Sequence, residues 1–146
     1  MLNKSDKQMK TQPINFWGPR SASYWLTALA AVGIIFLGLR FMVDPAAGAE
    51  GFGIALAPAK EAMAYGWIKG IRDIFSGLVV LLFLIPRKPQ ATAFAFGAAI
   101  IIPVSDCLTI LAVNGAQDVT HLLIHGVTAV YMMITTFFLF RAEPKN

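Results

Sequence analysis

A small set of ionisable side chains interrupts the long apolar runs of this 146-residue chain. Charged groups are costly in hydrocarbon, so such residues indicate either a functional site or buried ion pairs. A histidine beside a carboxylate can act as a general acid or base, and three residues are predicted to do so: Asp73, Asp106 and His125. Basic side chains can hold an anionic or carbonyl oxygen, and four residues are predicted to bind a ligand: Arg40, Lys69, Arg72 and His121.

Helical spacing places several of these residues on common faces. At about 100° per residue, Lys69, Arg72 and Asp73 fall on one face about 100° wide. His121 and His125, at spacing i, i+4, begin a polar stripe on another segment. Charge cannot face lipid, so both faces are predicted to turn towards the interior or a water-filled pocket. All of these positions lie towards the same end of the apolar runs, which predicts one polar layer in the outer half of the membrane.

A scaffold of ion pairs is an alternative explanation for the same residues. Lys69 can reach Asp73 one helical turn later, and Arg72 can reach Asp106 on another helix. These two pairs would neutralise four charges without any ligand. Arg40 can extend to the outer surface or pair with a nearby aspartate. The sequence leaves site and scaffold open as alternatives.

The two histidines do not complete a known metal motif. Their i, i+4 spacing would allow one metal ion to bind both rings, but HLLIH lacks the glutamate of the zinc-protease motif. Two histidines on one helix also cannot be opposite axial ligands of a haem iron. We therefore predict no metal site, and the sequence names no cofactor. Asp118 is predicted to be the N-cap of the helix that carries both histidines.

Four apolar segments must position these side chains. Hydrophobic residues make up 57% of the chain and charged residues only 14%, against about 25% charged in a soluble domain. Four segments are each long enough to cross about 30 Å of hydrocarbon, namely 24–43, 67–86, 91–113 and 119–140. We predict an all-α fold, a four-transmembrane-helix bundle over 24–141, with a polar tail at 1–23 and a short tail at 142–146.

The basic residues gather at the end of the bundle where both termini are expected. They are Lys4, Lys7, Lys10, Arg20, Arg87, Lys88, Arg141 and Lys145. By the positive-inside rule, both termini are predicted to be cytoplasmic in a multi-pass plasma-membrane protein. The net charge of +4 therefore reflects topology, and nucleic acid is not an expected partner, since no folded basic domain is present.

Three local motifs add detail to this architecture. Residues 44–66 are predicted to be a glycine-broken loop, with a helical turn in AKEAMAYG. A signal-peptide cleavage after AGA at 47–49 is an alternative that the length of the preceding run and Arg40 argue against. Gly66 and Gly70 form a GxxxG packing motif, and Pro103 is expected to kink its helix just before Asp106.

Four sequence blocks carry a family resemblance. GLRFMVDPAAGAEGFG, KGIRDIFSGLVVL, IPVSDCLTIL and HLLIHGVTAVYM lie within residues 38–133. Together they resemble an uncharacterised family of small four-helix membrane proteins of bacteria and fungi, similar in outline to DoxX-like proteins. The resemblance implies a four-helix membrane bundle with Arg72, Asp73 and Asp106 as signature positions. It implies no particular activity.

Three functions follow as hypotheses. The first is a polar pocket in the outer half of the bundle that binds a lipophilic, partly anionic or carbonyl-bearing small molecule. Acid-base chemistry such as isomerisation could then act on it, which would make the protein an enzyme. The second is a non-catalytic membrane subunit or scaffold in a quinone-linked, DoxX-like assembly. The third is a small proton-coupled carrier, which would need a homo-oligomer because four helices are few for alternating access.

Overall fold

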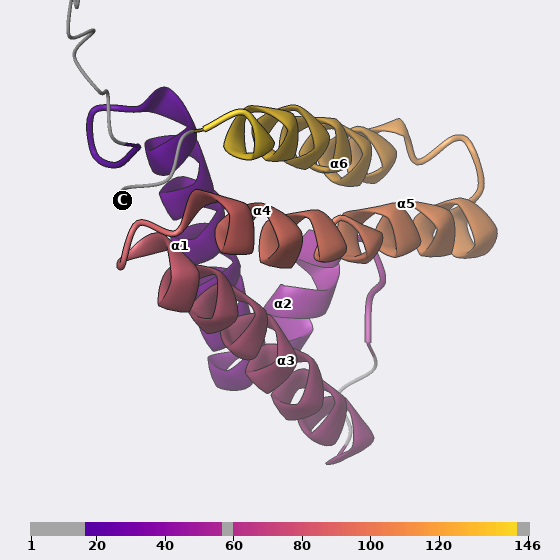
Figure 1. Ribbon diagram of the computed structural model, residues 1–146. Helices are drawn as coiled ribbons and strands as arrows, with labels where there is room; N and C mark the ends of the chain where they lie inside the picture. The colour runs from indigo at the N-terminus through magenta and orange to yellow at the C-terminus, as the bar shows by residue number, and fades with distance from the viewer. Residues whose placement is uncertain (1–16, 57–59, 143–146) are drawn as a thin grey trace, which may run out of the picture.

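The computed structural model describes residues 17–56 and 60–142, which fold into six α-helices (Figure 1). These are α1 (Ala22–Val43), α2 (Pro45–Phe52), α3 (Lys60–Leu84), α4 (Pro89–Ala98), α5 (Ile101–Asn114) and α6 (Val119–Phe140). The prediction of an all-α fold is confirmed for this part of the chain. Most of the predicted N-terminal tail (1–16) and of the C-terminal tail (143–146) lies outside the described residues.

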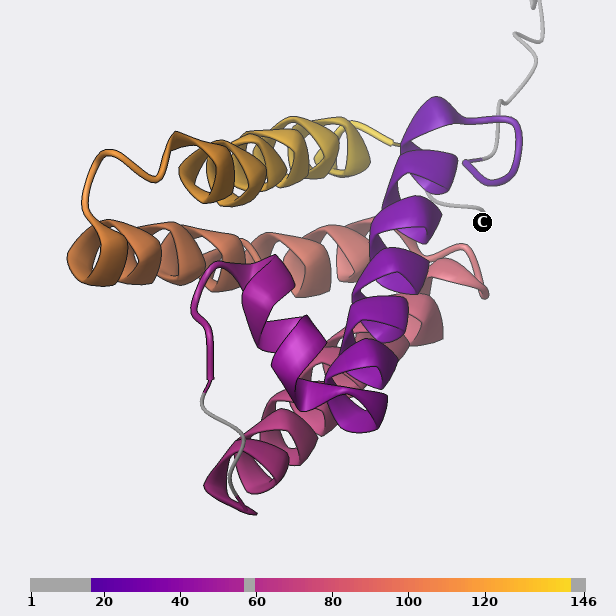
Figure 2. The same ribbon diagram turned by 180° about the vertical axis from the view of Figure 1, so that it is seen from behind.

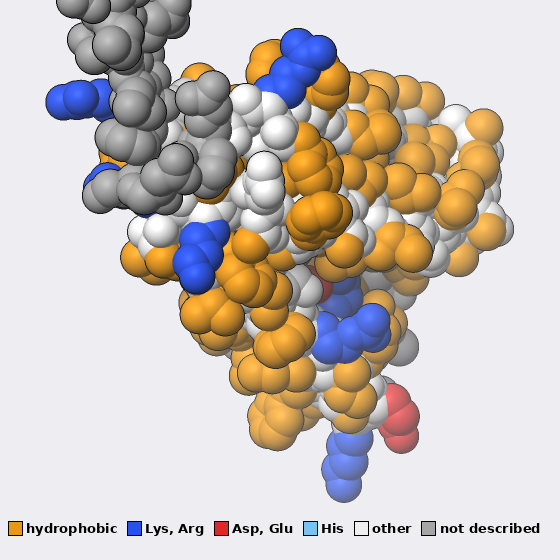
Figure 3. Space-filling view, viewed as in Figure 1, with side chains coloured by type: hydrophobic (Ala, Val, Ile, Leu, Met, Phe, Trp, Pro, Cys, Tyr) orange, Lys and Arg blue, Asp and Glu red, His pale blue; other side chains and the backbone are white. Residues whose placement is uncertain are grey.

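Three helical segments of the described chain are long and apolar enough to cross a membrane. They are 22–43, 89–114 and 119–140. Large apolar side chains cover much of the outer surface, as Figure 3 shows for one face. Such a surface is stable in lipid but not in water, so the fold indicates a small membrane protein. Helix α3 is also long, but it carries Lys69, Arg72 and Asp73 in its first half.

The helices form two groups that diverge from a common end (Figures 1 and 2). Helices α1 and α3 pack along one another, whereas α4 and α5 follow each other in one line beside α6. A buried apolar cluster holds the common end together and includes Trp17, Leu84, Phe96 and Leu139. Helix α2 packs on α1 and α3 on the side of the molecule where the groups diverge.

Glycines bring the backbones of α1 and α3 into close contact. A Cβ atom placed on Gly70 would lie 2.5 Å from the carbonyl oxygen of Gly38, and one on Gly66 would lie 2.6 Å from that of Phe41. Distances this short exclude any side chain at either position. The predicted packing role of the GxxxG motif is therefore confirmed, and it faces α1.

Helix boundaries differ from the prediction in two places. The predicted loop 44–66 is wrong in part, because α2 forms within it and α3 begins at Lys60. Asp44 caps α2 by accepting a hydrogen bond from the amide of Ala47, and Gly53 ends it with a φ of 106°. The third predicted segment divides into α4 and α5 just before Pro103, where the carbonyl of Ala99 accepts from Ile102 instead. Proline has no amide hydrogen to donate there, so the helical hydrogen bonds are interrupted at the expected place, while α4 and α5 stay in one line (Figure 1).

Candidate functional site

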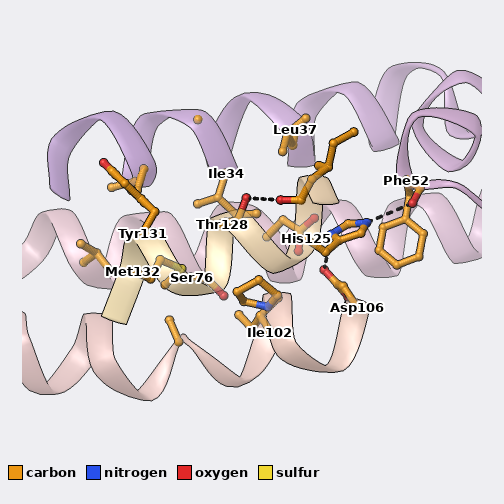
Figure 4. A pocket seen from close by; sticks show the side chains of 18 of the residues that line it. Ile34, Leu37, Phe52, Ser76, Ile102, Asp106, His125, Thr128, Tyr131 and Met132 are labelled. Carbon is orange, nitrogen blue, oxygen red and sulfur yellow. Dashed lines mark hydrogen bonds and ion pairs between the residues drawn. The ribbon is translucent and has the colours of Figure 1, made fainter. Parts of the chain in front are cut away.

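A cavity of about 400 Å³ lies between the two helix groups (Figure 4). All six helices contribute to its wall, which is mainly apolar. Eight lining residues carry polar side chains: Arg40, Lys69, Asp73, Ser76, Asp106, His125, Thr128 and Tyr131. The volume is within the range of about 300–1,000 Å³ that is typical of small-molecule sites. This space is the strongest candidate for a functional site in the described chain.

Lys69 and Asp73 form an ion pair on the α3 wall of the cavity. The Nζ atom of Lys69 lies 3.1 Å from Oδ2 of Asp73, and both side chains are largely buried. The same ammonium group lies over two aromatic rings, 5.0 Å from the centre of Phe41 and 5.1 Å from that of Phe52. The predicted i, i+4 pair is therefore confirmed. Lys69 is also held by cation–π contacts from α1 and α2.

His125 and Asp106 face each other across the α5–α6 contact. Nδ1 of His125 lies 3.8 Å from Oδ2 of Asp106, while Nε2 lies 3.1 Å from the carbonyl oxygen of Phe52 (Figure 4). A carbonyl can only accept, so Nε2 must carry a hydrogen and donate it. The Nδ1 atom is therefore the one left to gain or lose a proton, and it faces the carboxylate. The 3.8 Å separation is longer than a hydrogen bond, so a proton would pass between the two groups only through a bridging atom or after they move closer.

Hydrogen bonds join the chain segment after α2 to the C-terminal end of α5 and the N-terminal end of α6. We call this group, formed by Gly53, Asn114, Asp118 and His121, the clasp. Asn114 donates to the carbonyl oxygen of Gly53 at 2.7 Å and also to Asp118, the N-cap of α6. His121 directs Nδ1 at the same carboxylate, 2.8 Å from Oδ1. Hydrogen bonds from Asn114 first, and then from His121, hold the pKa of Asp118 below its ordinary value of 3.8. The clasp places Phe52 against His125, with ring centres 4.9 Å apart.

Arg40 stands at the edge of the cavity on α1. Its guanidinium donates to the carbonyl oxygen of Ala47 at 3.0 Å and packs over Gly51 of α2. Asp44 is occupied as the cap of α2, and the described residues contain no Arg40–Asp44 ion pair. Arg40 therefore keeps donor hydrogens and a full positive charge next to the cavity.

Comparison with known proteins adds a family assignment. A family model described as a domain of unknown function, DUF4267, matches residues 31–139, which is most of the chain. The chain belongs to the DUF4267 family. No curated protein and no solved structure matches it. The matched range includes every polar residue of the cavity wall, and the family description assigns no activity.

The DUF4267 fold brings five of the seven predicted site residues together. Arg40, Lys69, Asp73, Asp106 and His125 line the cavity, whereas Arg72 and His121 do not. Arg72 is exposed on the outer side of α3, and His121 is bound in the clasp. The expected Arg72–Asp106 ion pair is wrong: within the described part of the chain Asp106 faces His125 instead.

Sequence reasoning missed the aromatic residues of this DUF4267 site. Phe52 contacts both Lys69 and His125, and it lies at the end of a helix that was predicted to be loop. A signal for that helix was present, because Asp44 followed by Pro45 is a capping pattern and Gly53 is a common helix stop.

The donors around the cavity suit hydrogen bonding and proton transfer. Among residues 17–56 and 60–142, no three His, Cys, Asp or Glu side chains gather as a metal-ligand set. The polar groups instead form two pairs, Lys69 with Asp73 and His125 with Asp106. A ligand in the cavity would meet both pairs at its polar end and apolar side chains such as Val80 and Met132 along its length.

Proposed function

We propose that this protein binds a lipophilic small molecule in the cavity and acts on it by acid-base chemistry. The observation that carries the proposal is one space with an apolar wall and a histidine–carboxylate pair, His125 and Asp106. Intramembrane ionisable groups mark function by default, and here they surround open volume rather than packed side chains. An isomerisation fits, since a proton given by the His125–Asp106 pair to one carbon and taken back from another leaves the composition unchanged.

Each polar lining residue has a role in this proposal. His125 would exchange the proton, with Asp106 as its partner. Asp73 would hold Lys69, and Lys69 and Arg40 would orient the oxygen atoms of the ligand. Arg72 and His121 are left out of these roles because they lie outside the cavity wall.

The proposed setting is a plasma membrane crossed four times, with both termini on the cytoplasmic side. Helix α3 would be the fourth span, because it packs closely along α1 through Gly66, Gly70 and Gly77. The buried cluster that joins Trp17, Leu84 and Leu139 supports placing the start of α1 and the ends of α3 and α6 on one side. Arg20, Arg87, Lys88 and Arg141 lie near that end, which favours the cytoplasm.

A scaffold in a quinone-linked, DoxX-like assembly is the second candidate. The observation that favours it is the ion pair of Lys69 and Asp73, which is closed without any ligand. The open volume beside this pair argues for binding instead. A proton-coupled carrier acting as a homo-oligomer would use the same His125–Asp106 pair, and flux into liposomes driven by a pH gradient would distinguish it.

The proposal is tested by identifying small molecules that remain with the gently purified protein. Mass spectrometry of the extract should detect a lipophilic compound at near one equivalent per chain. Ser76→Phe, which fills the cavity wall, should lose that compound. Ser105→Phe is the matched control, because Ser105 also bonds its own helix but is exposed and outside the cavity. If both variants keep the compound equally, it binds elsewhere and the proposal fails.

A further inference from the structure

One of the charged side chains around the cavity, Arg40, has no ion-pair partner among the described residues. Arg40 and Lys69 are cations, and Asp73 and Asp106 are carboxylates, so the wall is formally neutral when His125 is neutral. Lys69 is matched by Asp73 at 3.1 Å. Arg40 has no carboxylate partner among the described residues, and its own hydrogen bond goes to a neutral carbonyl. A proton on the His125–Asp106 pair would therefore leave the wall with one excess positive charge.

We infer that the ligand is a lipophilic monoanion, and that the protein takes up one proton at the His125–Asp106 pair when it binds. This inference rests on the proposed ligand-binding function. The anion supplies the negative partner that Arg40 lacks. The proton removes the negative charge that Asp106 would otherwise present to the bound anion. The charges that are costly to bury are those of the bound anion and of Asp106, and the proton and the exposed guanidinium of Arg40 at the cavity edge together neutralise them.

The groups that face the pair from each neighbouring helix support this assignment. The cavity wall has Arg40 from α1, Lys69 and Asp73 from α3, and Tyr131 from α6 itself. Helices α2 and α4 place no titratable side chain on the described wall, and α2 contributes the carbonyl of Phe52. Tyr131 donates its hydroxyl hydrogen to the carbonyl oxygen of Leu26. The His125–Asp106 pair is thus the group placed to exchange a proton as the ligand enters.

Photolabelling in nanodiscs can measure whether the binding of an anion in the cavity depends on pH. Two probes of equal chain length would carry a terminal diazirine, one an alkyl sulfonate and the other an alkyl alcohol. The sulfonate keeps its charge at every pH used, so any pH dependence comes from the protein. Labelling of Phe96 and Met132 in the cavity is divided by labelling of the exposed Phe36 and Leu82, which corrects for partition into the lipid.

The expected result is tighter sulfonate binding at lower pH. Uptake of one proton means that binding weakens by up to about tenfold for each pH unit over the range in which the free pair has lost its proton, whereas alcohol binding should stay constant. The double variant Asp106→Asn/His125→Gln removes both titrating groups but keeps the excess charge of Arg40. That variant should bind the sulfonate with less than about a twofold change over the same range. The exposed Glu50, outside the cavity wall, gives the matched control Glu50→Gln, which should keep the wild-type pH dependence.

A second set of variants tests whether Arg40 binds the anion. Arg40→Gln should weaken sulfonate labelling of the cavity at least about tenfold and leave alcohol labelling unchanged, because the sulfonate loses its cationic partner and the alcohol needs none. Arg72→Gln, with an exposed arginine outside the cavity, is the control and should change neither. Sulfonate binding independent of pH in the wild type would overturn the inference, whatever the variants do. If the alcohol binds and the sulfonate does not, the inference of a monoanion is overturned but the proposed function stands. If neither probe binds, both the inference and the proposed function are overturned.

Discussion

His125 and Asp106 are joined by a geometry that fixes which nitrogen can exchange a proton. Nε2 of His125 donates to the carbonyl oxygen of Phe52 at 3.1 Å, and Nδ1 lies 3.8 Å from Oδ2 of Asp106. His121 has the opposite arrangement, because its Nδ1 lies 2.8 Å from a carboxylate oxygen of Asp118 and must donate to it. One helix thus holds two histidines in different tautomers.

This difference can be observed by nitrogen NMR. At a pH where both rings are neutral, His125 is expected to carry its hydrogen on Nε2 and His121 on Nδ1. Imidazole ¹⁵N shifts of selectively labelled protein distinguish the two forms. Asp118→Ala should release His121 from its tautomer and leave His125 unchanged. The same tautomer at both positions in the wild type would contradict the hydrogen bonds described here.

The α1–α3 contact predicts a strong effect at one glycine and a weak effect at another. A Cβ on Gly70 would lie 2.5 Å from both the carbonyl oxygen of Gly38 and Cγ of Met42, whereas one on Gly33 would have no atom within 4 Å. Gly70→Ala should therefore destabilise the protein by about 1–3 kcal/mol through overpacking. Gly33→Ala should change stability little. Melting temperatures in detergent would compare them, and equal values would mean that the helices do not meet at Gly70.

The sequence predicted those features that depend on local spacing. The bounds of α1 and α6, the cap at Asp118 and the pair of Lys69 with Asp73 all follow from residues within one or two helical turns. The partner of Asp106 could not be predicted in this way. Rotation about the axis of α3 places Arg72 beside Lys69, but only the packing of α5 and α6 decides that His125, and not Arg72, reaches Asp106.

The same limit applies to Phe52 and the clasp. Phe52 reaches His125 because Asn114, far along the chain, holds the carbonyl of Gly53. A contact between segments so distant in sequence leaves no periodic pattern in either. The capping residues of α2 could have predicted a helix there, but not which side chain it would bring to the cavity.

Acid should weaken the clasp through Asp118. Hydrogen bonds from Asn114 and His121 lower the pKa of Asp118 in the folded state below its ordinary value of 3.8. The ionised carboxylate therefore stabilises the fold fully above pH 3.8, and this stabilisation is lost as the pH falls through the folded-state pKa. Asp118→Ala should reduce the melting temperature at about pH 5 and have a smaller effect at about pH 3, below the ordinary value of 3.8. In Asn114→Ala, the loss should begin at higher pH. A difference between wild type and Asp118→Ala that is the same at both pH values would contradict this role.

The pair of Lys69 and Asp73 predicts that one substitution is worse than two. Removing either partner leaves the other charge buried without an opposite charge, which costs about 3–5 kcal/mol. Lys69→Met should be the more damaging, because it leaves the charge of Asp73, the more buried partner, without an opposite charge, whereas Asp73→Asn leaves Lys69 with the rings of Phe41 and Phe52. The double variant Lys69→Met/Asp73→Asn leaves no unpaired charge and should recover much of the lost stability. Thermal unfolding of the four proteins gives the interaction energy, and the exposed Lys60→Gln is the control for loss of a positive charge on α3. If the single changes add up to the double change, the two side chains do not interact.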